Sequence, residues 1–399
     1  MNESLLKKLK KVRLRDLGHV FLFLLALLPA RIYRQFHPHL WLICESEKEA
    51  RDNGYWFYRY LRERQPETDT VYAIRYDAQE CARVACLGPV VNYGSFRHWI
   101  YYLAAEVNIS SQKYGKPNAA VCYLLEVVLG WLKNRRVFLQ HGVTKDDLPF
   151  LHEDKAKFWM FCCAAEPEYA FIKNSFGYPA EAIQHVGFCR FDPLHDVEPD
   201  RDLLLIMPTW RMYLQRGGDR DAFLKSDYYL AWSGLLENGA LAELLGRLHK
   251  QAVFVLHREM GAFEALFQSS ANCITVLPWQ EADISSLIRE AGILITDYSS
   301  VYMDFAYMKK PLVYYQFDYE TYRAGHLPTG YFDYERDGFG PVCSTEQELL
   351  ARLEPLLTGG EMPPEYRQRV ERFYTLNDDK NCERTYLAIR EKLERENAL

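Results

Sequence analysis

Short apolar runs that alternate with longer helical patterns constrain the fold of this chain more than any other feature. The runs are rich in valine, isoleucine, leucine and aromatic residues, and they have the length of single strands. Such an alternation is typical of α/β folds with parallel sheets. The runs are Leu40–Cys44, Val71–Ile74, Val90–Tyr93, Val107–Ser110, Val137–Gln140, Phe158–Ala164, Ile183–Val186, Leu203–Met207, Val253–Leu256, Cys273–Leu277, Ile293–Thr296 and Leu312–Tyr315.

These runs form two series, which predict two domains. The polar, proline-containing stretch 195–202 separates them. A chain of 399 residues has room for two to three domains of about 150 residues each. We therefore expect two Rossmann-like domains that face each other across a cleft. The predicted parts are a basic amphipathic segment (1–36), an N-terminal acceptor domain (37–196), a C-terminal donor domain (203–364) and C-terminal helices (365–399).

Charge and cysteine usage exclude several classes of protein. The net charge is −6, which gives no reason to expect a nucleic-acid partner. The ten cysteines contain no C-x-x-C pair, and several lie in apolar runs, such as Cys162 and Cys163. They indicate buried thiols in a reducing cytoplasm, with neither a disulfide framework nor a zinc site. We expect no metal and no cofactor.

The first 36 residues combine positive charge with a short apolar run. Val20–Leu28 is apolar and is closed by Pro29. This run is shorter than the roughly 20 residues that cross a bilayer. We expect a helix that lies in the membrane interface on the cytoplasmic face; a first helix packed on the protein is the open alternative. The basic residues are Lys7, Lys8, Lys10, Lys11, Arg13, Arg15, Arg31 and Arg34, against Glu3 and Asp16.

The segment Gly292–Ala306 places two hydroxyl groups at a strand end. Its apolar run stops at Thr296, and Ser299 and Ser300 follow, just before a helical pattern. The unpaired N–H groups at the first turn of a helix bind anions, phosphate above all. Capping of the helix by the same hydroxyls explains the pattern equally well.

Polar residues also follow three other predicted strands, where ligands of open parallel sheets bind. Arg211 and His257 follow strands of the second series, and with Ser299 and Ser300 they are candidates to hold a diphosphate. His141 follows a strand of the first series. An imidazole titrates near pH ~6.5, so His141 is a candidate general base.

Further residues follow His141 in the same loop. Gly142 would allow an acceptor to approach the backbone closely. Asp146 or Asp147 could orient His141, although capping of the next helix explains them as well. Lys309 and Lys310 are most simply solvated surface charges. The sequence contains no P-loop, G-x-G-x-x-G, G-x-S-x-G or H-E-x-x-H motif.

The motifs between about residues 137 and 345 resemble those of the CDP-glycerol glycerophosphotransferases, the primases and polymerases of teichoic acids and related capsule polymers. The longest matching block begins at Thr296 and includes both serines. The matching motifs are Gln140–Lys145, Pro208–Arg211, Leu256–His257, Thr296–Ala306, Lys310–Tyr315, Asp318–Arg323 and Gly330–Tyr334. The chain departs from many members in having arginine, not proline, after His257.

The resemblance implies a GT-B fold and transfer of an alditol phosphate from a CDP-alditol to a hydroxyl group, with release of CMP. The acceptor would be a lipid-linked saccharide or polyol phosphate. His141 corresponds to the general base of the family, and His257, Ser299 and Ser300 to its pyrophosphate-binding group. Thr209 and Asp304 also match family positions and are substrate-binding candidates.

Several alternatives stay open at this point. The donor could be CDP-ribitol in place of CDP-glycerol. A GT-B glycosyltransferase that uses a nucleotide sugar would place a diphosphate in the same way. A non-catalytic, membrane-bound scaffold would require His141 and the serines to be structural. The sequence leaves a homo-oligomer open.

Overall fold

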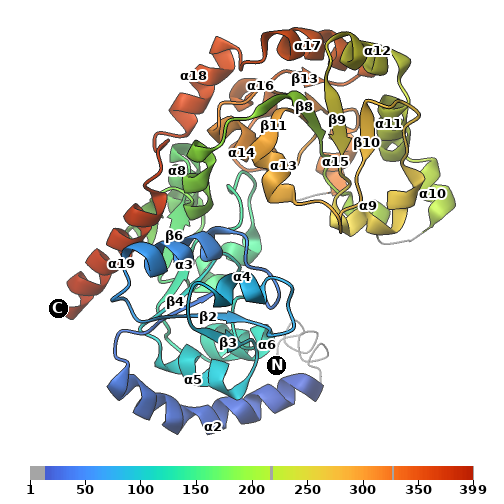
Figure 1. The fold of residues 1–399 in the computed structure, drawn as a ribbon. Helices are drawn as coiled ribbons and strands as arrows, with labels where there is room; N and C mark the ends of the chain where they lie inside the picture. The colour runs from blue at the N-terminus through green and yellow to red at the C-terminus, as the bar shows by residue number, and fades with distance from the viewer. Residues whose placement is uncertain (1–13, 216–218, 326–327, 399) are drawn as a thin grey trace. The chain divides into compact units, whose positions relative to one another are not determined.

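The computed structural model describes residues 14–215, 219–325 and 328–398, and these form two compact units (Figure 1). The first unit contains the chain up to His141, Pro149–Asp192 and the chain from Asp378 onward. The second contains Gly142–Leu148 and Pro193–Asn377. Residues 1–13, which carry five of the predicted basic side chains, lie outside the described residues.

The first unit is built on a parallel sheet, which has seven strands in the described chain in the order β3-β2-β1-β4-β5-β6-β7. This is the strand order of a Rossmann fold, and the order reverses between β1 and β4. The strands are β1 (Trp41–Cys44), β2 (Thr70–Ile74), β3 (Val90–Asn92), β4 (Val107–Ser110), β5 (Arg136–Phe138), β6 (Met160–Cys163) and β7 (Ile183–His185).

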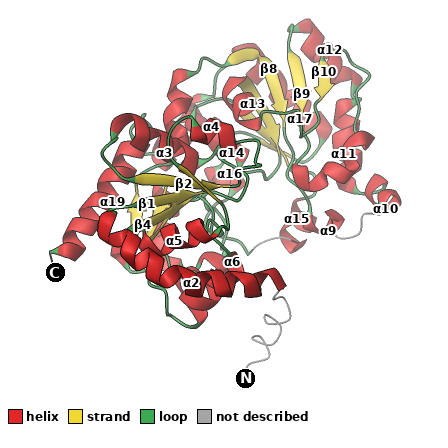
Figure 2. Ribbon diagram, turned by 60° about the horizontal axis from the view of Figure 1, so that its bottom comes forward, coloured by secondary structure: helices red, strands yellow, loops and turns green. Residues whose placement is uncertain are grey.

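Helices cover both faces of this sheet because neighbouring strand residues point to opposite sides. Trp41 and Ile43 of β1 pack with α3 and α19, whereas Leu42 packs with α2 and α5. Figure 2 shows these helices about the sheet. The helices of this unit are α2 (Leu14–Phe36), α3 (Asn53–Arg64), α4 (Cys81–Ala85), α5 (Phe96–Ala104), α6 (Ala119–Tyr123), α7 (Glu153–Ala156), α8 (Glu166–Ser175) and α19 (Asn381–Asn397), with a π-helical turn at Leu124–Val128.

Helix α2 corrects the expectation of a segment too short to cross a membrane. The helix continues through Pro29, and Arg15–Phe36 is long and apolar enough to span a bilayer by length and composition. One face nevertheless packs on the first unit, where Phe23 contacts Trp99 edge to face and Arg34 donates to the Ala104 carbonyl. The other face exposes apolar side chains: Leu17, Phe21, Leu24, Leu25, Leu27, Leu28, Ile32 and Phe36.

The second unit repeats the same architecture. Its parallel sheet has six strands among the described residues, in the order β10-β9-β8-β11-β12-β13, again reversing beside the first strand. The strands are β8 (Asp200–Ile206), β9 (Gln251–Phe254), β10 (Ile274–Val276), β11 (Ala291–Thr296), β12 (Leu312–Tyr315) and β13 (Val342–Cys343). Each of the twelve predicted runs overlaps a strand, and β13 is an additional strand in the described chain.

The helices of the second unit bury one apolar core against this sheet, with Trp232 and Leu353 among its fully buried side chains. They are α9 (Met212–Gln215), α10 (Arg220–Leu224), α11 (Asp227–Leu236), α12 (Gly239–Arg247), α13 (Ile284–Glu290), α14 (Val301–Tyr307), α15 (Tyr319–Gly325), α16 (Tyr334–Asp337), α17 (Glu346–Gly359) and α18 (Pro364–Phe373). The predicted C-terminal helices therefore divide: α18 belongs to the second unit and α19 to the first.

Lys310 is not the solvated surface charge that the sequence suggests. It is only 5% exposed, and its ammonium group donates to the carbonyls of Ile288, Arg289 and Ala291 at distances of 2.6–3.0 Å. These carbonyls lie at the end of α13, where the helix leaves them without intrahelical partners. Lys310 therefore closes the end of α13 from within the unit.

Candidate functional site

The candidate residue of the first unit, His141, lies beyond the carboxyl end of β5. Its Nδ1 lies 2.6 Å from Oδ2 of Asp52, which follows β1 in the same sheet. The imidazole side chain is 70% exposed, whereas the Asp52 side chain is only 9% exposed. The carboxylate of Asp52 raises the pKa of His141 above its usual value, and the positive charge of Arg190 opposes this effect.

Asp146, predicted from the sequence as the residue that orients His141, has its partners within the second unit, and Asp52 contacts His141 instead. Asp146 accepts hydrogen bonds from Lys145 at 2.7 Å and from Arg323 at 3.0 Å, and all three belong to the second unit. Nearby, the Asp147 amide donates to the Pro328 carbonyl. Asp146 therefore anchors the loop after His141 to the second unit.

The candidates of the second unit gather at the ends of β8 and β11, which are neighbours at the reversal of strand order. The Thr209 amide donates to Oδ1 of Asp297 at 2.7 Å. The Thr209 hydroxyl is buried and has no hydrogen-bond partner in the described part of the chain. Ser299 is 6% exposed, and Ser300 is exposed. Three hydroxyl-bearing residues therefore lie at the reversal point, where Rossmann folds bind ligands.

Ser300 stands at the N-cap position of α14, but its side chain does not cap the helix, contrary to the capping alternative for this residue. Helix α14 begins at Val301, and the side chain of Ser300 accepts no hydrogen bond from its N–H groups. Gly142 lies beside this residue: a Cβ atom built on Gly142 would be 3.7 Å from Oγ of Ser300. The structure thus brings two predicted residues, Gly142 and Ser300, together within the second unit.

Arg211 is not available to a diphosphate, contrary to the prediction. Its side chain is fully buried and forms ion pairs with Asp297 and Asp318, each at 2.8 Å. Three tyrosine rings surround the guanidinium, each with its centroid 5.0 Å away: Tyr228, Tyr298 and Tyr322. Two carboxylates already neutralise Arg211, so it braces the ends of β8, β11 and β12.

His257 follows β9, and its imidazole is close to two indole rings. The ring centroids of Trp210 and Trp279 are 6.3 and 6.0 Å from that of His257. Its Nδ1 accepts the amide of Glu259 at 3.2 Å, so the side chain caps the 3-10 helix Arg258–Leu266. Because Nδ1 accepts this hydrogen bond, the other ring nitrogen, Nε2, carries the proton when the imidazole is neutral.

Asp304 is buried on α14 rather than exposed at the sheet edge. Burial lowers the pKa of Lys310 to about 7, and the negative charge of Asp304 opposes that effect. The structure therefore places Asp304 in the electrostatic surroundings of a buried lysine.

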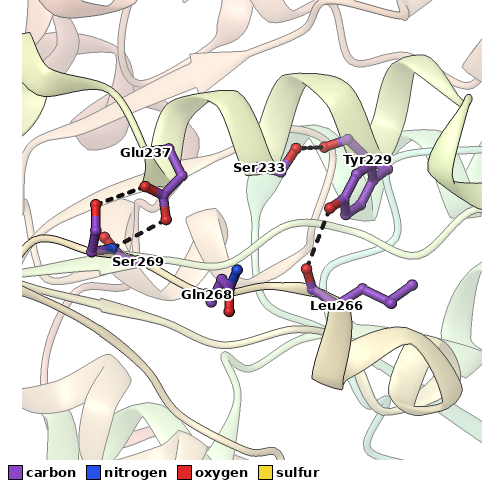
Figure 3. A pocket seen from close by; sticks show the side chains of 7 residues that line it. Tyr229, Ser233, Glu237, Leu266, Gln268 and Ser269 are labelled. Atoms are coloured by element: carbon purple, nitrogen blue, oxygen red, sulfur yellow. Dashed lines mark hydrogen bonds between the residues drawn. The ribbon is translucent and has the colours of Figure 1, made fainter.

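A cavity of about 380 Å³ in the second unit contains none of the candidate residues. It lies between α11 and the segment before β10, at the amino end of that strand (Figure 3). Its polar groups bond to one another: Tyr229 donates to the Leu266 carbonyl, and Ser270 donates to Glu237. The candidate donor residues lie at the opposite, carboxyl edge of the same sheet.

A family model for CDP-glycerol:poly(glycerophosphate) glycerophosphotransferases matches residues 31–391. The chain belongs to this family. Among its relatives is the minor teichoic acid biosynthesis protein GgaB of Bacillus subtilis, 28% identical over 369 residues, which cover 88% of this chain and 40% of GgaB. A teichoic acid poly(glycerol phosphate) polymerase of Bacillus spizizenii is 29% identical over 59% of this chain and 48% of its own length. The chain thus spans less than half the length of these two relatives.

Solved structures of the wall teichoic acid polymerase TagF share the fold of this chain. One of them, a variant soaked with CDPG, superposes with a TM-score of 0.66 over 99% of both chains at 16% sequence identity. At that identity the similarity establishes the fold, two parallel-sheet α/β domains of the GT-B type.

Reasoning from the sequence missed Asp52, which is 89 residues away from His141 in the chain. One signal could have identified it. Asp52 follows the first strand of its series, and in the Rossmann order that strand lies beside the reversal point. The polar residues after that strand, including Glu45 and Asn53, were therefore candidates in principle.

Proposed function

We propose that this protein transfers glycerol phosphate from CDP-glycerol to a hydroxyl group of a lipid-linked acceptor at the membrane and releases CMP, in the synthesis of a teichoic acid or capsule-type polymer. Membership of the glycerophosphotransferase family supports the reaction class. The observation that carries the proposal is the exposed imidazole of His141, anchored at Nδ1 by a buried carboxylate.

In this reaction Nε2 of His141 removes the proton from the acceptor hydroxyl. The acceptor oxygen attacks the phosphorus that bears the glycerol, and the bond from that phosphorus to the oxygen of CMP breaks. Thr209, Ser299 and Ser300 donate hydrogen bonds to the diphosphate, and His257 stabilises the charge that develops on it. Such catalysis works mainly by positioning and electrostatic stabilisation.

Removal of the imidazole tests the base. We expect His141→Ala to lower CMP release from CDP-glycerol by about 10²- to 10⁴-fold, measured with a synthetic lipid-linked disaccharide as acceptor. His39→Ala is the matched control, because His39 also contacts a carboxylate, Glu106 at 3.2 Å, and is 75% exposed. CMP release at the wild-type rate in His141→Ala would contradict the proposal.

The donor site is tested by binding. A hydrogen bond to a charged group contributes about 1.5–3 kcal/mol, so each of Thr209→Val, Ser299→Ala and Ser300→Ala should weaken CDP binding roughly 10- to 100-fold in calorimetry. Ser233→Ala, in the cavity at the opposite sheet edge, is the control. The same titrations with CDP-glycerol, CDP-ribitol and a UDP-sugar decide the donor, and preference for either of the last two would refute CDP-glycerol.

We further propose that α2 attaches the protein to the cytoplasmic face of an anionic membrane. The exposed face of α2 is apolar while its buried face holds it on the first unit, as in helices that lie in the interface. Leu24→Gln with Leu28→Gln should abolish co-sedimentation with phosphatidylglycerol vesicles and leave folding intact. Leu124→Gln, exposed on the π-helical turn, is the control. Unchanged co-sedimentation of the double variant would show that another surface binds the membrane.

A further inference from the structure

Resting on the proposed role of His141 as general base, we propose that Asp52 is a positioning residue that fixes the tautomer and orientation of that imidazole. The Nδ1–Oδ2 distance of 2.6 Å is that of a strong hydrogen bond to a charged group. When His141 is neutral, Nδ1 carries the proton that Asp52 accepts. Nε2 then carries the lone pair, and this is the atom that a base must present to the acceptor hydroxyl.

The carboxylate of Asp52 is itself held in place. It lies at the start of α3, and Nε of Arg190 is 3.3 Å from its Oδ1. Glu45 accepts the backbone amides of Arg51, Asp52 and Tyr55, at distances of 2.6–3.0 Å. The turn that presents Asp52 is therefore pinned by a second, fully buried carboxyl group.

The backbone of the His141 loop is clamped from the same helix start. The Asn53 side chain donates to the carbonyl of Gln140 at 2.8 Å. Gln140 has a φ of 62°, a left-handed conformation that few non-glycine residues adopt. Its side chain donates to the Cys162 carbonyl and to Glu168. Adjacent residues, Asp52 and Asn53, thus fix the imidazole and the loop that carries it.

The charges around His141 give the pair a defined pH dependence. The charge of Asp52 favours protonation of the imidazole, as does that of Glu45 when it is ionised, and Arg190 opposes it. Burial and the charge of Asp52 raise the pKa of Glu45 to about 8. Because a base must be neutral to accept a proton, removal of the Asp52 charge moves the acidic limb of the rate profile to lower pH.

Asp52→Asn tests the positioning role with little change in shape. The amide of asparagine can donate to Nδ1 and thereby favour the tautomer that carries the proton on Nε2, which cannot act as a base. We expect kcat for CMP release to fall by about 10²-fold or more. The acidic limb of kcat/KM should also move to lower pH, and a purely structural role for Asp52 would not move it.

A measurement without turnover keeps this inference separate from the proposed function. In the full chain labelled with ¹⁵N-histidine, the signals that disappear in His141→Gln belong to His141. In the wild type these signals should show the Nδ1-protonated tautomer at high pH. In Asp52→Asn they should show the Nε2-protonated tautomer and a lower titration midpoint. Asp69→Asn is the matched control, because Asp69 lies 2.6 Å from Nδ1 of another histidine, His37, and both side chains are 40% exposed.

The possible outcomes are distinct. An unchanged tautomer, midpoint and kcat in Asp52→Asn would overturn the positioning role. A changed tautomer and midpoint with a lowered kcat would support it. If His141→Ala released CMP at the wild-type rate, His141 would not be the general base. The pair of Asp52 and His141 would then have no role in catalysis, even if the NMR titration confirmed their hydrogen bond.

Discussion

Arg211 and Asp318 form a two-point ion pair in the interior of the second unit. Nε of Arg211 is 2.8 Å from one carboxylate oxygen of Asp318, and Nη2 is 3.0 Å from the other. Asp297 contacts the same guanidinium, and Nη1 donates to the Thr209 carbonyl. Arg211 therefore holds the strand ends that carry the candidate donor residues, and its own guanidinium is engaged by Asp297, Asp318 and the Thr209 carbonyl.

Truncation of Arg211 should destabilise the protein strongly. Arg211→Ala leaves two buried carboxylates without their counter-charge, which typically costs about 3–5 kcal/mol of unfolding free energy. Arg247→Ala is the control: its pair with Glu354 is exposed, and such pairs contribute about 0–1 kcal/mol. Urea unfolding of both variants measures the difference, and equal effects would show that the buried network adds no stability.

Two glycines near the His141 loop should respond differently to alanine. A Cβ on Gly330 would lie 2.8 Å from Cα of Asp146 and closer still to the Lys145 carbonyl, whereas a Cβ on Gly142 meets Ser300 at 3.7 Å. We expect Gly330→Ala to cost about 1–3 kcal/mol of stability. Gly142→Ala should keep the fold and weaken CDP binding. Thermal unfolding and calorimetry separate the two effects, and equal stability of both variants would contradict this reading.

The pair of Asp146 and Arg323 should contribute to stability but not to the titration of His141. Burial pushes the pKa of Asp146 upward, but Lys145 and Arg323 outweigh it and hold that pKa below its usual value. A lowered native pKa stabilises the folded state above the unfolded pKa, and this contribution is lost as pH falls through the native pKa. Asp146→Asn should therefore lose stability at pH 7 and little at acidic pH. A shift of the His141 titration in this variant would restore Asp146 as its partner.

The stability contributed by Lys310 should depend on pH. Its pKa is lowered to about 7, so above pH 7 the unfolded chain binds more protons at this residue than the folded chain does. Stability must then rise with pH between about 7 and the unfolded pKa, by at most about 1.4 kcal/mol per pH unit. The difference in unfolding free energy between wild type and Lys310→Met should grow over this window. The charge of Lys309 is partly exposed, so the difference in unfolding free energy between wild type and Lys309→Met should not grow over this window.

The sequence predicted the strands well because their signal is local. An apolar run of strand length, such as Ile293–Thr296, is buried on both faces whichever helices cover it. The short strand β13 (Val342–Cys343) was missed because two residues are too few to show the pattern of apolar residues that predicts a strand. The position of Ser299 and Ser300 at a strand end was predictable for the same local reason. Their assignment to the donor remains a prediction.

The partners of charged residues were not predictable in this way. Asp146 is close to His141 in sequence, yet the residue that accepts the hydrogen bond of His141 is Asp52, which is 89 residues away in the chain. Arg211 was predicted to bind a diphosphate because it follows a strand, but its guanidinium is paired with the carboxylates of Asp297 and Asp318. Lys310 looked solvated beside Lys309, and only the end of α13 explains its burial.

The sequence by itself determined the two series of parallel strands, the loops that bear polar groups and the family of this protein. Hydrophobic periodicity and residue type suffice for these, because they depend on neighbours in the chain. Only the tertiary structure decided which charges are buried and which residue holds His141. The free energy of a charge depends on the desolvation and counter-charges around it, and folding brings these from distant parts of the chain.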